Sequence, residues 1–368
     1  MRLVGVMSGT SVDGLDVAVL EVSAGAPRIV AAETVPLPDS LATALSNLAT
    51  PGSNEIVRMG DADAALGVFI GETVAACLDR WGILRGDVRA IGCHGQTIRH
   101  HPDATTPFTV QIGDPNRIAE ITGIDVVADL RRRDLAAGGE GAPLAPLFHE
   151  ALFRDKVRHR VVVNVGGIAN ATMLPAASTS ILGFDTGPGN ALLDAWTRHC
   201  LSTPFDHDGT WSASGERQAR LFDVLCADAF VGREPPKSTG KETYNLDYVI
   251  DACRGLDLEP ADVQATLAEF TAWSIATSVR RWGPPGGDVV VCGGGRRNAH
   301  LMERLTTHLD GYDVMPCDDL DVDGDALEAA AFAWFAHHRL ERRAGNAPAV
   351  TGASGPRVLG AVYAGQPP

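Results

Sequence analysis

The stretch that decides the fold opens the chain: Leu3-Val4-Gly5-Val6-Met7-Ser8-Gly9-Thr10-Ser11-Val12-Asp13-Gly14-Leu15-Asp16. Residues 3–7 form an apolar run typical of a buried strand, residues 8–14 have the composition of a turn, and residues 15–22 alternate sufficiently for a second strand. Successive backbone N–H groups in such a turn, lined by small hydroxyls, can hold phosphate. The alternative is an ordinary hairpin loop, since glycine turns are common.

The same plan recurs further along the chain. Residues 161–165 are a second buried-strand run, which ends in a glycine turn and continues into a strand-like segment over 168–174. Two more strand-to-turn-to-helix junctions follow, so glycines gather at four predicted strand ends: Gly9 and Gly14, Gly166 and Gly167, Gly187 and Gly189, and Gly293 to Gly295. Ligands of open α/β sheets bind at such edges, which favours phosphate binding over plain hairpins.

The length of 368 residues exceeds the roughly 250–300 at which a single core stops growing, so two α/β domains are expected. An apolar strand gives way to arginine- and glycine-rich sequence near residues 125–145. We therefore expect an N-terminal domain over 1–130, a C-terminal domain over 131–345, and a tail over 346–368 that folds back.

Composition excludes several classes of function. A net charge of −15 and a pI near 5.1 disfavour nucleic acid as a partner. No segment approaches the roughly 18 apolar residues needed to span a bilayer. The seven cysteines are scattered and never spaced as CxxC, so neither a disulfide framework nor a zinc site is indicated. Because the chain starts on a strand-like segment rather than a charged leader, we expect a cytoplasmic protein.

None of the glycine clusters matches GxxxxGK[ST] or GxGxxG, which argues against a Walker P-loop and a Rossmann dinucleotide site. The segment Pro236-Lys237-Ser238-Thr239-Gly240-Lys241 contains two of the only three lysines in the chain. We interpret it as a surface loop that presents ammonium groups to phosphate or sugar, the alternative being a solvated turn.

Phosphoryl transfer needs a carboxylate to orient or deprotonate the nucleophile, and oxygen ligands for Mg²⁺. Asp13, Asp16 and Asp185 are the candidates in the turns. Asp185 ends a predicted strand and opens a turn into a helix, where it could face a cleft between two domains or simply cap the helix. His94 and Gln96 suit hydrogen bonding to sugar hydroxyls, although a structural role is the plainer interpretation of His94 alone.

Together these segments resemble the anhydro-N-acetylmuramic acid kinase family, a branch of the hexokinase, acetate kinase and actin superfamily. Eight ordered motifs carry the resemblance over nearly the whole chain: residues 5–16, 92–97, 111–114, 138–144, 164–170, 184–190, 235–241 and 292–298. The resemblance implies an α/β fold of two ribonuclease-H-like domains with an interdomain cleft. It also implies that ATP and water convert 1,6-anhydro-N-acetylmuramic acid into N-acetylmuramic acid 6-phosphate and ADP during peptidoglycan recycling, and that the protein is a homodimer.

The resemblance also assigns roles to individual residues. Asp185 would be the general base that activates water, and Glu328 would lie near the metal or the transferring phosphate, with Asp13 as the second metal residue. The ATP site would comprise Gly9, Thr10, Ser11, Val12, Asp13, Gly14, Leu15, Asp16, Gly166, Gly167, Gly187, Gly189, Gly293, Gly294 and Asn298. The sugar would lie near His94, Gln96, Asp129, Arg132 and Asn170. A Mg²⁺ ion is expected because an ATP tail beside several carboxylates would otherwise be repelled.

Two other functions fit the same fold. One is an ordinary sugar kinase in which Asp185 deprotonates a free hydroxyl; the other is an ATP-driven switch like the actin branch. The sugar-side residues 94–97 and 129–133 favour an enzyme, because a pure switch would not need them.

Overall fold

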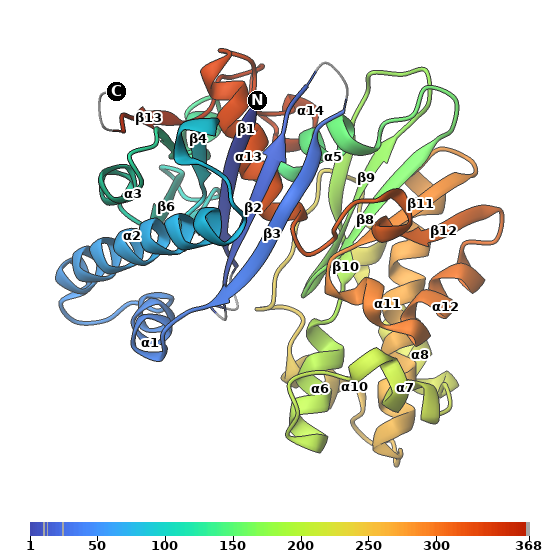
Figure 1. Cartoon of the computed structure of the whole chain (residues 1–368). Helices are drawn as coiled ribbons and strands as arrows, with labels where there is room; N and C mark the ends of the chain where they lie inside the picture. The colour runs from blue at the N-terminus through green and yellow to red at the C-terminus, as the bar shows by residue number, and fades with distance from the viewer. Residues whose placement is uncertain (10–11, 13, 24–25, 366–368) are drawn as a thin grey trace. The chain divides into compact units, whose positions relative to one another are not determined.

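The computed structural model describes residues 1–9, 12, 14–23 and 26–365, and the chain forms two compact units (Figure 1). Unit 1 combines Met1–Leu152 with Ala326–Pro368, and unit 2 is Phe153–Asp325. Each unit is built around one main sheet.

The main sheet of unit 1 has the order β13-β7-β4-β1-β2-β3. Strands β1, β2 and β3 form an antiparallel meander, whereas β4 runs parallel to β1, and β7 parallel to β4. The strands are β1 (Arg2–Ser8), β2 (Gly14–Glu21), β3 (Arg28–Pro36), β4 (Val88–Cys93), β7 (Val126–Ala128) and β13 (Ala361–Tyr363). The remaining elements are α1 (Asp39–Leu48), α2 (Glu55–Arg80), η1 (Arg85–Asp87), the hairpin β5 (Gln96–His101) and β6 (Phe108–Ile112), α3 (Pro115–Thr122), α4 (Arg132–Leu135), α5 (Ala145–Phe153), α13 (Leu327–Leu340) and α14 (Pro348–Thr351).

Helices α2 and α13 cover opposite faces of this sheet. Val4 and Val6 of β1 share an apolar cluster with Leu66 and Ile70 of α2. Their neighbour Gly5 points the other way, because side chains alternate along a strand. A Cβ on Gly5 would lie 1.8 Å from the backbone oxygen of Ala329, so glycine lets α13 pack directly on β1.

The sheet of unit 2 has the order β10-β9-β8-β11-β12. Strands β8, β9 and β10 are an antiparallel meander, and β11 and β12 continue the sheet in parallel with β8. The strands are β8 (Arg160–Val165), β9 (Ile168–Leu174), β10 (Leu182–Pro188), β11 (Gly287–Cys292) and β12 (Tyr312–Pro316). The helices are α6 (Ala191–Leu201), η2 (His207–Gly209), α7 (Thr210–Ser214), α8 (Ala219–Cys226), α9 (Ala229–Gly232), α10 (Leu246–Ala252), α11 (Pro260–Trp282), η3 (Gly294–Arg297), α12 (Ala299–His308) and η4 (Cys317–Leu320).

Five strands of each sheet therefore have the same topology, three antiparallel strands followed by two parallel strands on the side of the first, and β13 is added to the unit 1 sheet beyond β7. In unit 2 the buried valines of β8 pack with α11 and α12, including Ile275 and Leu301. This repetition confirms the predicted fold class of two ribonuclease-H-like units.

The units divide after residues 152 and 325, not at 130 and 345 as the composition suggested. Residues 131–152 stay with unit 1 because the buried carboxylate of Asp134 accepts hydrogen bonds from the Gly141 N–H, Asn346 Nδ2 and Thr351 Oγ1 at 2.7–2.8 Å. Helix α13 returns to the first sheet, and β13 pairs antiparallel with β7. Within the described ranges, no helix is long and apolar enough to cross a membrane.

Candidate active site

Two predicted site residues of unit 1, His94 and Asp129, lie at one edge of its sheet together with Ser8. Ser8 ends β1, His94 follows β4, and Asp129 follows β7. These three strands are parallel neighbours, so their carboxyl ends meet at the same edge, where open α/β sheets bind ligands.

The first glycine turn connects β1 to β2 at this edge. The Val12 N–H donates to the Gly9 oxygen at 3.2 Å, and the Ser8 hydroxyl is buried without a hydrogen-bond partner among the described residues. Thr10, Ser11 and Asp13, predicted for this turn, lie outside the described residues. Gly14 begins β2, and the Leu15 side chain is fully buried in the core, so it anchors the strand rather than lining the turn. A buried, unpaired hydroxyl beside the turn fits a ligand rich in acceptor oxygens.

Asp16 and Glu328 are electrostatic neighbours in unit 1. Asp16 pairs with Met7 in the β1–β2 register and accepts a hydrogen bond from Thr34 Oγ1 at 2.6 Å. Glu328 lies in the first turn of α13, and although part of its surface reaches solvent, desolvation and then Asp16 raise its pKa, against the effect of Arg131. Mutual repulsion of two carboxylates favours a cation between or beside them. Across the described part of the chain, no three His, Cys, Asp or Glu side chains form a ready metal site.

His94 is a buried, neutral hydrogen-bonding group. Its Nε2 accepts from Arg131 Nε at 3.0 Å, its Nδ1 lies 2.9 Å from the Gly95 oxygen, and its ring packs on Phe332 with the ring centroids 4.6 Å apart. Burial and Arg131 lower the pKa of His94 well below its usual value. Both contacts fit a neutral imidazole protonated on Nδ1. Arg131, which the sequence did not single out within the arginine run, is the residue that donates to His94.

A cavity of about 160 Å³ brings together His94, Asp129 and Arg132. Arg132 Nε donates to Asp129 Oδ1 at 2.7 Å. Residues that sequence reasoning missed complete the wall: Asp63, Gln111 and Tyr363 among others. Gln96 is buried at the start of β5, and its Oε1 has no hydrogen-bond partner within the described ranges. Asn170 belongs to unit 2.

The three glycine turns of unit 2 pack against one another at the carboxyl ends of β8, β10 and β11. The N–H groups of Gly189 and Asn190 donate to the oxygens of Gly167 and Gly166 at 2.9 and 2.8 Å. A Cβ on Gly189 would lie 2.3 Å from the Gly166 oxygen, and one on Gly293 would lie 2.4 Å from Asn164 Oδ1. The turns therefore need glycine at these two points to approach so closely.

Gly187 has a different role from the other glycines. It lies at a register shift in β10, where a Cβ would come within 3.1 Å of Ser274 Oγ in α11. It is buried, so it permits the strand to pack on this helix.

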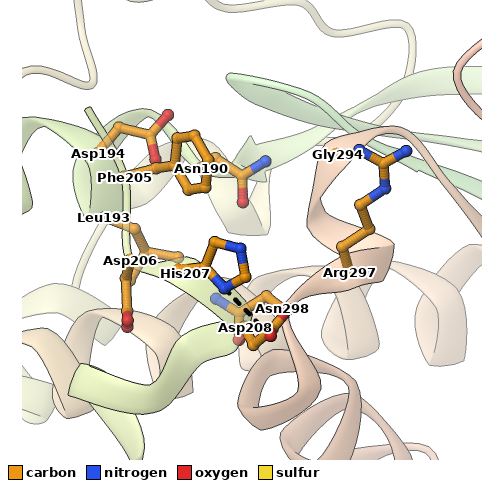
Figure 2. Close-up of a pocket in the computed structure, with 10 residues that line it drawn as sticks. All are labelled: Asn190, Leu193, Asp194, Phe205, Asp206, His207, Asp208, Gly294, Arg297 and Asn298. Carbon is orange, nitrogen blue, oxygen red and sulfur yellow. Dashed lines mark ion pairs between the residues drawn. The ribbon is translucent and has the colours of Figure 1, made fainter. Parts of the chain in front are cut away.

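A cavity of about 330 Å³ adjoins these turns (Figure 2). In Figure 2, Gly294 and Arg297 approach from the connection after β11, whereas Asn190 and Asp194 come from the start of α6. Asn298 also lines the cavity and caps α12, its Oδ1 accepting from the Leu301 N–H at 2.9 Å. A cavity of this size suits a small-molecule ligand.

Sequence reasoning missed one part of the lining of this cavity, residues 205–208. The ring centroids of Phe205 and His207 are 6.2 Å apart, with an interplanar angle of 22°. Asp206 holds the loop in place by accepting from the N–H groups of Trp211 and Ser212, both at 2.9 Å. No glycine cluster marks this segment, so the sequence offers little signal for it.

Asp185 lies inside β10 rather than at its end, since the strand continues to Pro188. It is directly opposite Asn170 of β9, so the two side chains lie on the same face of the sheet. Its Oδ2 accepts a hydrogen bond from the Thr239 N–H at 3.0 Å. Helix α6 begins at Ala191 after Asn190, so Asp185 does not cap it, which removes the alternative interpretation.

The prediction of a surface loop presenting both lysines is wrong for Lys237. Only 6% of Lys237 is exposed, and its ammonium group donates to backbone oxygens rather than facing solvent. Lys241 is exposed, and its Cε lies 2.7 Å from the position of a Cβ on Gly167. Lys241 therefore lies against the first glycine turn of unit 2, where an ammonium group could meet phosphate.

The duplicated sheet topology defines the class: a two-unit α/β protein of the ribonuclease-H-like type to which hexokinases and actin belong. The sequence model described as anhydro-N-acetylmuramic acid kinase matches residues 1–365. The chain therefore belongs to the anhydro-N-acetylmuramic acid kinase family.

Individual relatives carry the same family name. The anhydro-N-acetylmuramic acid kinase of Coxiella burnetii (strain Dugway 5J108-111) is 46% identical over 366 residues, which cover 99% of this chain and 98% of the relative. The protein of the same name from Cupriavidus pinatubonensis is 47% identical, with 98% of each chain covered. Among solved structures, the activator of 2-hydroxyisocaproyl-CoA dehydratase from Clostridium difficile has a TM-score of 0.47 and 14% identity, covering 93% of this chain and 97% of its own.

Proposed function

We propose that this protein is an ATP-dependent kinase that opens 1,6-anhydro-N-acetylmuramic acid with water and phosphorylates O6. The products are N-acetylmuramic acid 6-phosphate and ADP, as needed in peptidoglycan recycling. The observation that carries the proposal is the family match over residues 1–365, which covers every element of both units.

The substrate dictates an unusual reaction, because an anhydro sugar has no free 6-hydroxyl. Water forms a bond to C1 and loses a proton to the Asp185 carboxylate, while the C1–O6 bond breaks. O6 then forms a bond to the γ-phosphorus, and ADP departs. The hydrogen bond from the Thr239 N–H supports this role, because it fixes one carboxylate oxygen and so orients the group.

The nucleotide would be bound by elements of unit 2, and the first glycine turn of unit 1 would hold phosphate. We assign the 330 Å³ cavity beside Gly294 and Asn298 to the nucleoside, since it adjoins the packed glycine turns. The Ser8 hydroxyl supports phosphate binding at the Gly9–Asp16 turn, because it is buried and has no partner among the described residues. Lys241 would add a positive charge near Gly166 and Gly167.

The carboxylates of Asp16 and Glu328 fit a Mg²⁺ ion, since the charge of Asp16 disfavours the negative charge of Glu328. Asp13, which the family resemblance assigns to the metal, would hold the ion together with them. Mg²⁺ usually takes one or two carboxylates and the phosphates of its substrate. When bound, it would neutralise charge on the transferring phosphate.

The sugar would be held by His94, Asp129 and Arg132, which share a cavity, and by Gln96. A neutral His94 can hydrogen-bond without adding charge, and the buried Gln96 Oε1 lacks a partner in the described part of the chain, as expected of an acceptor for a sugar hydroxyl. The consumption of ATP suits a cytoplasmic protein, and the family resemblance suggests a homodimer. Light scattering during gel filtration tests the dimer.

Sugar-dependent release of ADP tests the proposal. Purified protein with Mg²⁺ and ATP should release ADP only when 1,6-anhydro-N-acetylmuramic acid is present, with one sugar phosphate formed for each ADP. Phosphorylation of free hexosamines but not of the anhydro sugar would indicate an ordinary sugar kinase. ATP turnover that ignores every sugar would indicate a switch.

A further inference from the structure

We propose that Lys237 is a positioning residue for this reaction: its buried ammonium group anchors the segment 237–239, and that segment holds the Asp185 carboxylate. The proposal rests on the function of Asp185 proposed above. Lys237 is the lysine that the sequence analysis predicted to lie on the surface.

The segment 237–239 runs beside β10, the edge strand of its sheet, and bonds twice to Asp185. The Asp185 N–H donates to the Lys237 oxygen at 3.2 Å, and the Thr239 N–H donates to Asp185 Oδ2 at 3.0 Å. The orientation of the carboxylate therefore depends on where this segment lies. Small displacements matter, because catalysis requires reacting groups to be placed within a fraction of an ångström.

The ammonium group of Lys237 fastens the segment to α9. Its Nζ donates to the oxygens of Phe230 and Val231 at 3.0 and 2.9 Å. It also lies 4.7 Å from the centre of the Phe230 ring and 5.7 Å from that of Phe184, the residue before Asp185. One side chain thus joins α9, β10 and the segment that holds the carboxylate.

Burying the Lys237 ammonium group costs free energy, so the side chain is expected to do more than fill space. Lysine is seldom buried unless it is paired, and among the described residues no carboxylate forms an ion pair with Lys237. Burial, with Arg233 and Arg281, lowers the pKa of Lys237 to about 8. A methionine of similar length would fill the same space without that cost.

Lys237 acts on Asp185 through its charge as well as through the position of its side chain. The charged groups that face the ammonium are Arg233 and Arg281, which oppose its protonation, and Asp185 and Asp228, which favour it. Electrostatic interaction is mutual, so the protonated lysine favours the ionised form of Asp185. A general base must be ionised before it can accept a proton.

The test compares Lys237→Met with Lys156→Met, a change at the exposed lysine. We expect Lys237→Met to lower kcat at least tenfold while both KM values stay within twofold, and to move the acid limb of the kcat–pH profile to higher pH. Lys156→Met should match the wild type in all three. The proposal would be overturned if Lys237→Met left both kcat and the acid limb unchanged. It would also be overturned if the variant changed KM alone.

Lys237→Arg keeps the inference testable if the methionine variant does not fold. Arginine retains the charge but cannot place its donors as lysine does, so kcat should fall while the acid limb stays in place. A wild-type kcat in Lys237→Arg would contradict the positioning role. The proposed function is tested separately. If the wild-type protein releases no ADP in response to the sugar, the proposed function is refuted. If the wild type is active and Lys237→Met is equally active, only this inference is refuted.

Discussion

Replacing Asp185 with asparagine should remove the base and leave the site intact. The amide oxygen of Asn can still accept from the Thr239 N–H, so the segment 237–239 and the fold should survive. Loss of a general base costs about 10²–10⁴ in rate, which corresponds to about 2.7–5.4 kcal/mol at 1.36 kcal/mol per decade. Asp185→Ala should lose the same activity and in addition about 1–3 kcal/mol of stability, because the Thr239 N–H loses its acceptor.

The assay measures kcat for sugar-dependent ADP release, the Kd for ATP by calorimetry, and the free energy of unfolding by urea titration. Asp257→Asn, at an exposed aspartate, is the matched control and should behave as the wild type in each. ATP affinity of Asp185→Asn should stay within about twofold, since other elements form the nucleotide cavity. A kcat within about threefold of the wild type would refute the assignment of Asp185 as the base.

Four further variants test the unit 2 site. Gly189→Ala should weaken ATP binding at least tenfold because its Cβ would collide with the Gly166 oxygen. Gly166→Ala should bind ATP within threefold of the wild type by calorimetry, because its Cβ would meet only the Ile168 oxygen, at an ordinary contact distance of 3.6 Å. Asn298→Ala removes the cap of α12 and should cost about 0.5–2 kcal/mol in urea unfolding; no change would mean that the cap is dispensable. Burial raises the pKa of Asp194 from 3.8 to about 6. The free energy that Asp194 contributes to folding is therefore lost as the pH rises from about 4 to 6. At pH 7, Asp194→Asn should be more stable than the wild type by up to about 3 kcal/mol. A constant difference between these two proteins from pH 4 to 7 would contradict that assignment.

Much of the fold could be predicted from the sequence because its signals are local. The apolar runs at residues 3–7 and 161–165, each ended by a glycine turn, indicate the repeated strand plan directly. The unit boundaries could not be predicted in this way. The boundary after residue 325 depends on α13, which packs on β1 because Gly5 leaves room for Ala329 more than three hundred residues later. The boundary after residue 152 depends on the contacts of Asp134 with Asn346 and Thr351.

The site divides along the same line. Glycine turns and Asp185 were found because turn chemistry marks them. Lys237 was misplaced because its polar neighbours suggest a surface loop, while Phe184 and the oxygens of α9 that bury it come from other elements. Residues 205–208, which line the unit 2 cavity, contain no glycine cluster that would have indicated a site. Within the arginine run, only the structure distinguishes Arg131, which contacts His94, from Arg132, which contacts Asp129.

The central claim is that water opens the anhydro bridge at C1 as the phosphate arrives at O6, and labelling the water tests it most directly. The protein is incubated with Mg²⁺, ATP and 1,6-anhydro-N-acetylmuramic acid in ¹⁸O water, and the product is fragmented in a mass spectrometer. Unlabelled product kept in ¹⁸O water for the same time corrects for exchange at C1. The account predicts one ¹⁸O at C1 and an unlabelled phosphate on O6; label in the phosphate with none at C1 above the exchange control would contradict it.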